Sequence, residues 1–391
     1  MAKTNWQRLG LPLLVGVAAG VGVGYVAQQL KNRVEPTVIP RPIDWDRARR
    51  VALRVSGWDQ HPVTDRATRE AEYLAFSKQS EVAIADYLGV ALPVPIQSVV
   101  VVDRKEWLSA NFATLALMLR PLEELYAKLY AQGRGSKYDG PVAGVQLGGM
   151  FGYLARRVLG QYELGLLSPE PKEQGTLYFV EPNIDRLQRQ LGLSDEFRYW
   201  IALHEVTHVF EFEAHPWVRD YFSGLLNEFL HSMTRQLAEQ GVGLGSLLQR
   251  LARGASFERH PLTWLMSAEE RALFDKLQAL MSLVEGYSDH VMNVLGERLL
   301  PSFKEIERQV AAKKSARSSL EEGLERLMGM DLKRAQYKEG ERFVDSVVRE
   351  RGLDFLNRVW EKPENLPSLA EIRAPTRWVR RLDGLQLEAG A

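Results

Sequence analysis

The residues best suited to chemistry in this sequence are two histidines separated by one helical turn, with a glutamate beside the first. They lie in the segment His204-Glu205-Val206-Thr207-His208, which has the pattern HExxH. Residues four apart project from one face of a helix, so His204 and His208 can bind one metal ion together. Zinc held by three protein ligands keeps a water molecule in its fourth position and lowers the pKa of that water, and Glu205 can accept the proton. The motif therefore predicts a hydrolytic site with one zinc ion.

The residues around the motif predict a buried helix. Ser194 is a suitable N-cap, and Pro216 prevents the helix from continuing past His215. The apolar residues between these limits leave almost no polar stripe along the helix, which is typical of a helix with no solvent-facing side. Buried histidine and glutamate need partners. A metal ion can supply them, and the alternative is a pair of core histidines that hydrogen-bond to backbone carbonyls.

A stable zinc site needs a third protein ligand, and Glu285 is the best candidate. It flanks the apolar seam of a long helix predicted over residues 267–298, where an unpaired carboxylate would cost several kcal/mol. Asp289 lies one turn later and could accept the free ring N–H of a ligand histidine. Glu211 lies on the face of His204 but about 10 Å along the helix, too far to share the ion. The alternative is that Glu285 and Asp289 pair with an arginine.

A second possible metal pattern fails on its spacing. His215 invites comparison with HExxHxxGxxH, which requires glycine at position 211 and histidine at position 214. The chain has Glu211 and Ala214. We therefore do not expect His215 to be a ligand.

The remaining sequence predicts a mainly α protein with a small β component. Residues 96–102 and 176–180 are β-branched or apolar and read as buried strands. Helical periodicity covers most of the rest. The predicted helices span residues 44–55, 64–88, 105–131 with a break at Pro121, 141–160, 194–215, 216–239 and 267–298, with charged helices over 301–351.

The N-terminus predicts a membrane anchor. Residues 9–30 contain no charge and are long enough to cross a bilayer after a short tail, residues 1–8. Gly16, Gly20 and Gly24 have the spacing of helices that pair in membranes, which makes a homodimer possible. A flexible Gly/Ala-rich tail is the alternative. The basic residues that follow the segment favour a cytoplasmic body. A linker over residues 31–43 leads to a catalytic domain over residues 44–391.

The composition argues against nucleic acid as a partner and excludes any chemistry that needs cysteine. Fifty lysine and arginine residues balance fifty aspartate and glutamate residues, so there is no electrostatic case for nucleic acid. The chain has no cysteine, which excludes disulfides, thiolate metal ligands and cysteine nucleophiles. Any metal must therefore be held by histidine and carboxylate.

Several segments resemble an uncharacterised bacterial family of zincin-like metallopeptidases that is labelled as associated with biosynthesis of the deazaflavin coenzyme F(420). The resemblance covers nearly all residues from 43 to the end and implies a mainly helical zincin-like fold with HExxH as the metal site. The ExxSD pattern of Glu285 to Asp289 also resembles the ligand helix of thermolysin-like gluzincins, in which the glutamate binds zinc and the aspartate supports a ligand. The segments are IDWDRARRVA from 43, VVVDRKEWLSAN from 100, GVQLGGMFGYLARRVLGQY from 144, FRYWIALHEVTHVFEFEAHPW from 197, EGYSDHVMNVLG from 285, LKRAQYKEGERFVDSVV from 332 and ENLPSLAEI from 364.

These features favour a membrane-anchored zinc metallopeptidase that acts on a peptide or protein substrate. Tyr287, His290 and Tyr337 are possible donors to the oxyanion of the tetrahedral intermediate, and the sequence does not choose among them. By analogy with zincins, one of the predicted strands could align an extended substrate.

Two other functions are compatible with parts of the sequence. A helical di-iron oxidase could use two ExxH pairs, Glu205 with His208 and Glu228 with His231. A membrane-tethered interaction protein could keep the zincin fold without turnover. Metal analysis separates the first from the peptidase, and Glu205→Gln separates the second.

Overall fold

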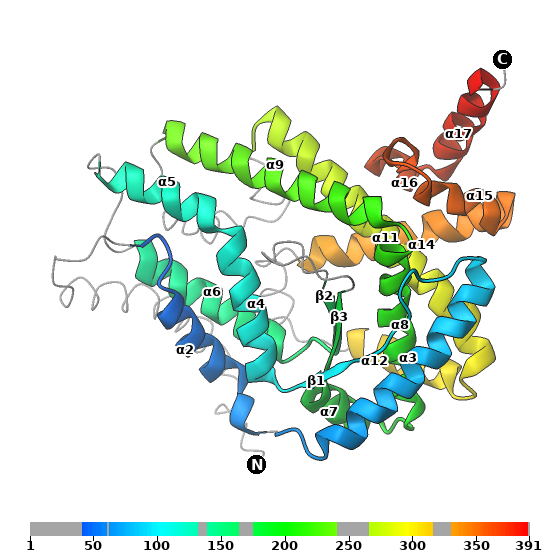
Figure 1. The fold of residues 1–391 in the computed structure, drawn as a ribbon, viewed down its shortest axis with the longest axis horizontal. Coiled ribbons are helices and arrows are strands. Elements are labelled where there is room, and N and C mark those ends of the chain that lie inside the picture. The colour runs from blue at the N-terminus through cyan, green and yellow to red at the C-terminus, as the bar shows by residue number, and fades with distance from the viewer. Residues whose placement is uncertain are drawn as a thin grey trace, which may run out of the picture.

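The computed structural model describes residues 41–60, 62–131, 139–163, 175–240, 266–315 and 330–389, and over these residues the fold is mainly helical with one small sheet (Figure 1). This agrees with the predicted fold class. The helices are α2 (Trp45–Ser56), α3 (Arg66–Leu88), α4 (Arg104–Met118), α5 (Arg120–Ala131), α6 (Asp139–Ala155), α7 (Glu181–Leu191), α8 (Glu196–Glu213), α9 (Pro216–Gln240), α11 (Ala268–Leu299), α12 (Phe303–Ser315), α14 (Met330–Arg351), α15 (Leu353–Asn357), α16 (Leu369–Arg373) and α17 (Pro375–Ala389).

The sheet has three strands in the order β1-β3-β2, so β3 (Thr176–Val180) lies in the centre. β1 (Val100–Val102) runs parallel to β3, and β2 (Gly160–Glu163) runs antiparallel to it. Within the described residues β2 pairs on one side only, with β3. It is therefore an edge strand.

Strand alternation divides the interior into two cores. Side chains of successive strand residues point to opposite faces. Val101 and Phe179 point into the main core with α3, α8 and α11. Val102 and Val180 point into a second core, which includes Trp107 of α4 and small residues of α2. Figure 1 accordingly shows α8 and α3 to one side of the sheet and α4, α6 and α2 to the other.

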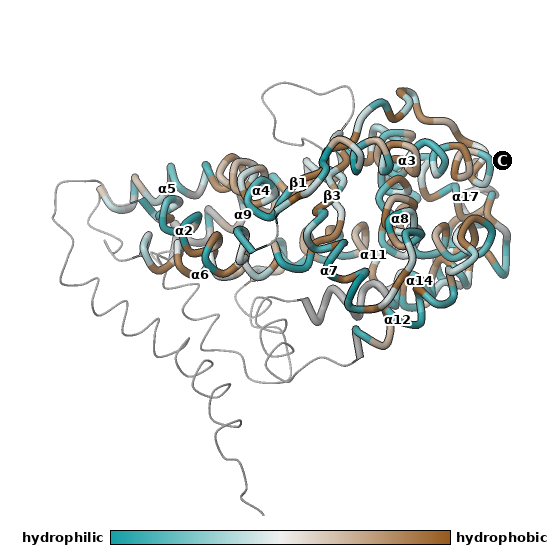
Figure 2. Tube along the Cα trace, turned by 90° about the horizontal axis from the view of Figure 1, so that it is seen from below, coloured by the Kyte–Doolittle hydropathy of each residue, from teal (hydrophilic) through white to brown (hydrophobic). Residues whose placement is uncertain are grey.

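The two cores lie toward opposite ends of the molecule. Figure 2 shows α2, α5 and α6 at one end and α3, α14 and α17 at the other, with β1 and β3 between them. At the second end Trp378 of α17 is fully buried and contacts the rings of Phe343 and Phe355 edge to face. Its indole N–H donates to the carbonyl of Asn365 at 2.7 Å. These contacts attach the C-terminal helix to α14 and α15.

Glycines bring α2 and α6 into close parallel contact. A Cβ at Gly144 would lie 2.5 Å from the carbonyl oxygen of Asp44, and one at Gly148 would lie 2.4 Å from that of Ala48. Such distances are too short for any side chain, so the two backbones touch. Gly144 and Gly148 therefore serve the close packing of α6 against α2.

The structure corrects several details of the predicted elements. The strand predicted over 96–102 is formed only over residues 100–102, and the helix predicted over 141–160 ends at Ala155, with residue 160 in β2. The elements that were not predicted at all are β2, α7, α15, α16 and α17. Ser194 is not the N-cap of α8; Asp195 occupies that position without a side-chain cap, and the Ser194 hydroxyl hydrogen-bonds with that of Ser302 at 3.1 Å.

The predicted membrane anchor, residues 9–30 with Gly16, Gly20 and Gly24, lies outside the described residues, as does most of the predicted linker. No helix in the described part of the chain is both long and apolar enough to cross a membrane. Ile43, at the end of the predicted linker, is fully buried.

Candidate metal centre

Helices α8 and α11 bring His204, His208 and Glu285 together. One ligand atom from each lies within 4.8 Å of the other two. The imidazole rings of His204 and His208 meet edge to face with centroids 4.8 Å apart, as expected for residues one turn apart. All three side chains are half-buried. Two imidazoles and a carboxylate from a distant helix thus have the composition of a catalytic zinc site.

The described residues contain no other group of this kind. Glu228 and His231 of the di-iron hypothesis are exposed on α9, and His231 Nδ1 hydrogen-bonds with the carbonyl of Asn227 at 2.7 Å. His215 is also outside the group, because its ring stacks on Trp360 with centroids 5.6 Å apart. The geometry therefore favours neither the di-iron site nor the site that includes His215.

A buried carboxylate orients the ring of His208. The Nδ1 of His208 lies 2.7 Å from an oxygen of Glu211, which is 1% exposed. The Ser288 hydroxyl donates to the other oxygen of Glu211 at 3.1 Å and lies 3.1 Å from the same Nδ1. With Nδ1 engaged in this way, Nε2 of His208 remains for an ion.

The electrostatic environment of this pair is strongly negative. Burial by itself lowers the pKa of His208, but the contact with Glu211 and the charges of Glu285 and Glu205 raise it well above its usual value. Burial raises the pKa of Glu211, opposed by His208 and Ser288. In the absence of metal the pair therefore retains a proton. A metal cation bound here would take the place of that proton, because the same negative surroundings stabilise either positive charge.

The side chain of Glu205, the predicted base, extends from α8 toward the edge strand β2. Its side chain is 7% exposed. A Cβ at Gly160 of β2 would lie 2.6 Å from Cγ and Oε1 of Glu205, so only glycine leaves room for the carboxylate at this point of the strand. Tyr162, two residues along β2, donates to Glu213 at the end of α8. The edge strand thus runs along the motif helix beside the base.

A buried ionic network fixes the first half of α8. Arg198 is 2% exposed, and its guanidinium donates to Glu181 of α7 at 2.7 Å. The same carboxylate accepts a hydrogen bond from Tyr73 of α3 at 2.6 Å. Phe76 of α3 stacks on Tyr199 with centroids 4.9 Å apart. α8 is therefore tied to α3 and α7 one to two turns before the first ligand.

Close backbone contact fixes α11. A Cβ at Gly286 would lie 2.2 Å from the carbonyl carbon of Gly340 in α14, and one at Gly340 would lie 1.8 Å from the carbonyl oxygen of Ser282. The helices therefore cross without side chains between them. Glu285 precedes Gly286, so its position depends directly on this crossing.

The predicted oxyanion donors have other partners. Tyr287 donates from Oη to Asn357 at 2.7 Å, and burial raises the pKa of its hydroxyl. His290 is hydrogen-bonded at both ring nitrogens, to Tyr87 at 2.9 Å and to Asp345 at 2.8 Å. The side chain of Tyr337 lies outside the described part, and Asp289 is half-buried on α11 one turn after Glu285. The geometry thus favours neither Tyr287 nor His290 as the donor.

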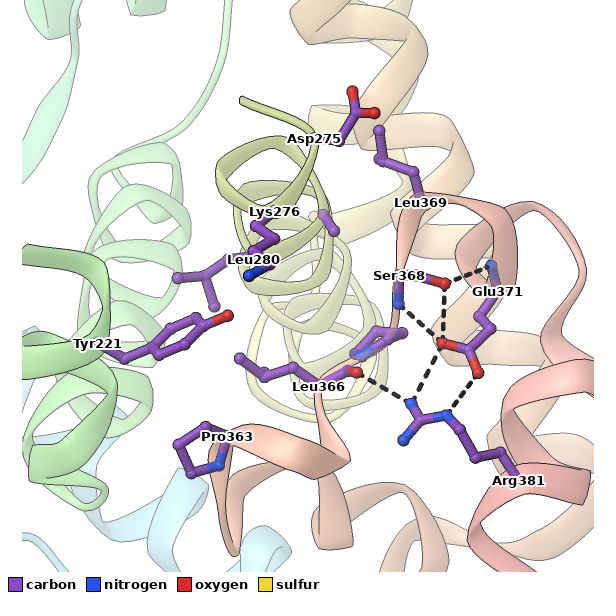
Figure 3. Close-up of a pocket in the computed structure, with 12 residues that line it drawn as sticks. Tyr221, Asp275, Lys276, Leu280, Pro363, Leu366, Ser368, Leu369, Glu371 and Arg381 are labelled. Atoms are coloured by element: carbon purple, nitrogen blue, oxygen red, sulfur yellow. Dashed lines mark hydrogen bonds and ion pairs between the residues drawn. The ribbon is translucent and has the colours of Figure 1, made fainter. Parts of the chain in front are cut away.

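A cavity of about 320 Å³ elsewhere on α11 is distinct from this centre (Figure 3). It lies between Tyr221 of α9, Leu280 of α11 and the C-terminal segment around Leu366. Figure 3 shows Arg381 and Glu371 paired on one side of it, with Arg381 donating at 2.6 Å. None of the three clustered residues lines it, so the cavity and the metal centre are separate features.

Comparisons with known proteins identify the chain's family and a similar solved structure. The chain belongs to the zincin-like metallopeptidase family, whose pattern it matches over residues 43–379. It is also similar to a chain from Chloroflexus aurantiacus, whose crystal structure is described as that of a proposed hydrolase with a novel fold. The two are 50% identical with a TM-score of 0.66, and the match covers 87% of this chain and 99% of that one. No curated protein matches the chain. The association with coenzyme biosynthesis stays a prediction.

Proposed function

We propose that this protein is a zinc-dependent peptidase in which His204, His208 and Glu285 bind one zinc ion. The observation that carries the proposal is the 4.8 Å grouping of three ligand atoms, one of which comes from a helix far along the chain. Zinc bonds to nitrogen and oxygen are about 2 Å long, so three ligands of one ion lie about 3–4 Å apart. The observed group needs only a small contraction. When bound, zinc lowers the pKa of water and polarises a carbonyl group.

The chain's own residues supply the remaining roles. Glu205 accepts the proton of the attacking water and then donates it to the leaving amine. Glu211, supported by Ser288, keeps the ring of His208 in the tautomer that offers Nε2. Asp289 is proposed to orient the other ligand imidazole in the same way.

The edge strand is proposed to align the substrate. β2 passes Glu205 at Gly160 and pairs with β3 on one side within the described residues. A peptide in extended conformation can add to a strand edge through backbone hydrogen bonds, with little dependence on sequence. The strand would then hold the scissile bond beside the base. The substrate class is accordingly a peptide or protein segment in extended form.

Metal content tests the ligand set. Purified full-length protein is expected to bind one zinc per chain, and His204→Ala and Glu285→Ala are each expected to remove it. Glu228→Ala is the matched control, because Glu228 is an exposed carboxylate outside the group. Two irons per chain, or zinc retained after Glu285→Ala, would contradict the proposal.

Activity tests the base. Glu205→Gln is expected to retain zinc and to lower peptide hydrolysis by about 10²–10⁴-fold, the usual contribution of a general base. The protein's biological role should then be lost with the activity. If that role survives Glu205→Gln but is lost when the fold is disrupted, the protein acts instead as a binding partner with an inactive zincin fold.

A further inference from the structure

The cavity between α9, α11 and the C-terminal segment has apolar walls and a charged mouth. Its volume is about 320 Å³. Sites for small molecules begin at about 300 Å³, so a ligand of this cavity must be small. The apolar lining consists of Ala279, Leu280, Pro363, Leu366, Pro367 and Leu369. These walls suit a ligand with an apolar part.

Arg381 holds the C-terminal wall of the cavity in place. Its guanidinium donates to the two oxygens of Glu371 at 2.6 and 3.2 Å. It also donates to the carbonyls of Glu364 and Leu366, at 2.6 and 3.0 Å. The hydroxyl of Ser368 donates to the same carboxylate at 2.9 Å. The charges of Arg381 and Glu371 therefore balance each other on one side of the cavity (Figure 3).

Helices α9 and α11 form the opposite wall, and an apolar cluster joins them. Leu225 of α9 packs with Leu273 and Leu277 of α11, and Tyr221 packs against this cluster. The ring of Trp217 meets that of Tyr221 edge to face, with centroids 6.1 Å apart. Both walls are thus fixed by contacts within the protein. A ligand would not have to order them, which favours binding.

Three polar groups at the cavity are not used by these contacts. Tyr221, Asp275 and Lys276 all line it. Within the described part of the chain, neither Asp275 nor Lys276 forms an ion pair, and the hydroxyl of Tyr221 has no hydrogen bond. Figure 3 shows the Tyr221 hydroxyl and the Lys276 ammonium on the same side of the cavity, with the Asp275 carboxylate turned away from that ammonium. One positive charge, one negative charge and one hydroxyl are therefore available to a ligand.

The charges around the cavity select the charge of that ligand. Burial raises the pKa of Tyr221, and the negative charges of Glu228 and Glu364 raise it further, so the hydroxyl stays protonated and can donate. These carboxylates and Asp275 disfavour a simple anion. The ammonium of Lys276 disfavours a simple cation. The surroundings therefore favour a ligand that carries both charges.

We propose that this cavity binds a small α-amino acid with an apolar side chain. Its carboxylate accepts from the ammonium of Lys276 and the hydroxyl of Tyr221, and its ammonium pairs with Asp275. Neighbouring residues of a helix point about 100° apart, so Asp275 and Lys276 diverge. The opposite charges carried on one carbon of an amino acid can contact both. The apolar side chain then lies against Leu280 and Leu366.

Equilibrium dialysis of the full-length protein with radiolabelled L-leucine tests the proposal. Two analogues each lack one charge: 4-methylpentanoate has no ammonium, and 3-methylbutylamine has no carboxylate. We expect leucine to bind at least about tenfold more tightly than either analogue, because each analogue loses a charge-assisted contact. If 4-methylpentanoate or 3-methylbutylamine binds as tightly as leucine, the ligand is not an amino acid and the proposal is overturned.

Substitutions assign each charge of the ligand to its partner. Lys276→Gln is expected to weaken leucine binding about tenfold and to leave the binding of 3-methylbutylamine unchanged. Asp275→Asn should weaken leucine binding to a similar extent and leave that of 4-methylpentanoate unchanged. Both residues are exposed, so both variants should fold. Lys304→Gln is the matched control, because Lys304 is an exposed lysine of α12 that pairs with Glu297 at 3.4 Å.

An amino acid can also bind to zinc, so the same dialysis is repeated with His204→Ala after its folding is checked by circular dichroism. Leucine affinity should be unchanged. Loss of leucine binding in folded His204→Ala would place the ligand at the metal centre and overturn the proposal. No leucine binding by wild type, or equal binding by wild type and Lys276→Gln, would also overturn it, and Lys276→Gln decides if His204→Ala unfolds. Zinc content of wild type is measured on the same preparations and reports on the metal centre alone, so the two proposals fail separately.

Discussion

The two helices that carry the candidate ligands are held in place in different ways. α8 carries two ligands and the base within five residues, and a buried network of Arg198, Glu181 and Tyr73 ties it to its neighbours. α11 carries one ligand, and its backbone touches that of α14 at Gly286 and Gly340. Spacing along one helix fixes the first two ligands relative to each other. The third ligand depends on how closely two helices approach.

This difference predicts which substitutions disturb the metal and which disturb only the fold. A change that alters the α11–α14 crossing should displace Glu285 and weaken zinc binding. A change that weakens the attachment of α8 should lower the free energy of unfolding, while the spacing of His204 and His208 stays as the helix dictates. Each helix therefore offers a way to test the comparison.

The largest effect is expected from Gly340→Ala. Its Cβ would lie 1.8 Å from the carbonyl oxygen of Ser282, and neither backbone atom can move alone. α14 must separate from α11, so we expect the free energy of unfolding to fall by more than about 3 kcal/mol, at or beyond the usual cost of overpacking. Zinc affinity of the folded protein should fall at least about tenfold. Chemical denaturation and a competitive zinc titration measure the two effects.

Gly148→Ala is the control for this prediction. A Cβ at Gly148 would lie 2.4 Å from the carbonyl oxygen of Ala48, in the other close helix pair. It should destabilise the fold by overpacking, while the folded fraction keeps its zinc affinity. If both glycine variants alter zinc affinity equally, the α11–α14 crossing has no special relation to Glu285.

The next effect is expected from Arg198→Met on α8. The substitution leaves Glu181, which is 5% exposed, with only Tyr73 and the more distant Arg69 at 3.4 Å. Breaking a buried ion pair from one side costs about 3–5 kcal/mol, and Arg69 should reduce the loss to about 3 kcal/mol. Urea denaturation measures it. Zinc affinity should change less than tenfold.

Two variants refine this result. Arg189→Met removes an exposed ion pair with Asp185 and should cost less than about 1 kcal/mol. Arg198→Met combined with Glu181→Leu should recover part of the lost stability, because no charge is then left buried. If Arg198→Met is fully folded but no longer binds zinc, the network of Arg198, Glu181 and Tyr73 positions the zinc ligands in addition to holding α8 in place.

A smaller effect is expected from Glu211→Gln, which keeps the shape of the side chain but removes its charge. The amide still contacts His208 Nδ1, but it no longer favours one tautomer of the ring. Loss of such a partner usually weakens metal binding about 10–100-fold. Glu213→Gln, on the same helix but bonded to Tyr162 and Arg219, is the control and should leave zinc affinity nearly unchanged. Equal zinc affinity in Glu211→Gln and wild type would show that Glu211 does not support His208 as a zinc ligand.

Periodicity explains what could be predicted from the sequence. The HExxH spacing and the apolar seam of the long helix are local patterns, and together they pointed to α8 and to Glu285. Helical rise argued against Glu211 as a ligand, but its contact with His208 was missed. A signal was present, because residues three apart on a helix are neighbours and a buried glutamate requires a partner.

The elements that could not be predicted depend on distant contacts. β2 begins with glycine and contains no β-branched residue, and it is a strand because it pairs with β3. α7 was not among the predicted helices, although proline in its first turn is a local signal for the start of a helix. The glycine crossing behind Glu285 joins residues from two helices, which no local pattern can relate.

The smallest effect is expected from His215, which lies between α8 and α9. It concerns the stability of the fold and not the binding of a metal. Burial against Trp360 lowers the pKa of His215 to about 4. An unfolded histidine takes up its proton near pH 6.5, so the folded state loses stability as the pH falls from 6.5 toward 4 and keeps it above 6.5. Because the ring is only half-buried, we expect this part of the loss to be about 1–2 kcal/mol. His215→Gln should remove it, measured as the difference in the pH dependence of the free energy of unfolding. His231→Gln, on an exposed histidine, should leave the curve unchanged, and a curve for His215→Gln that matches wild type would show that His215 takes up its proton without cost to the fold.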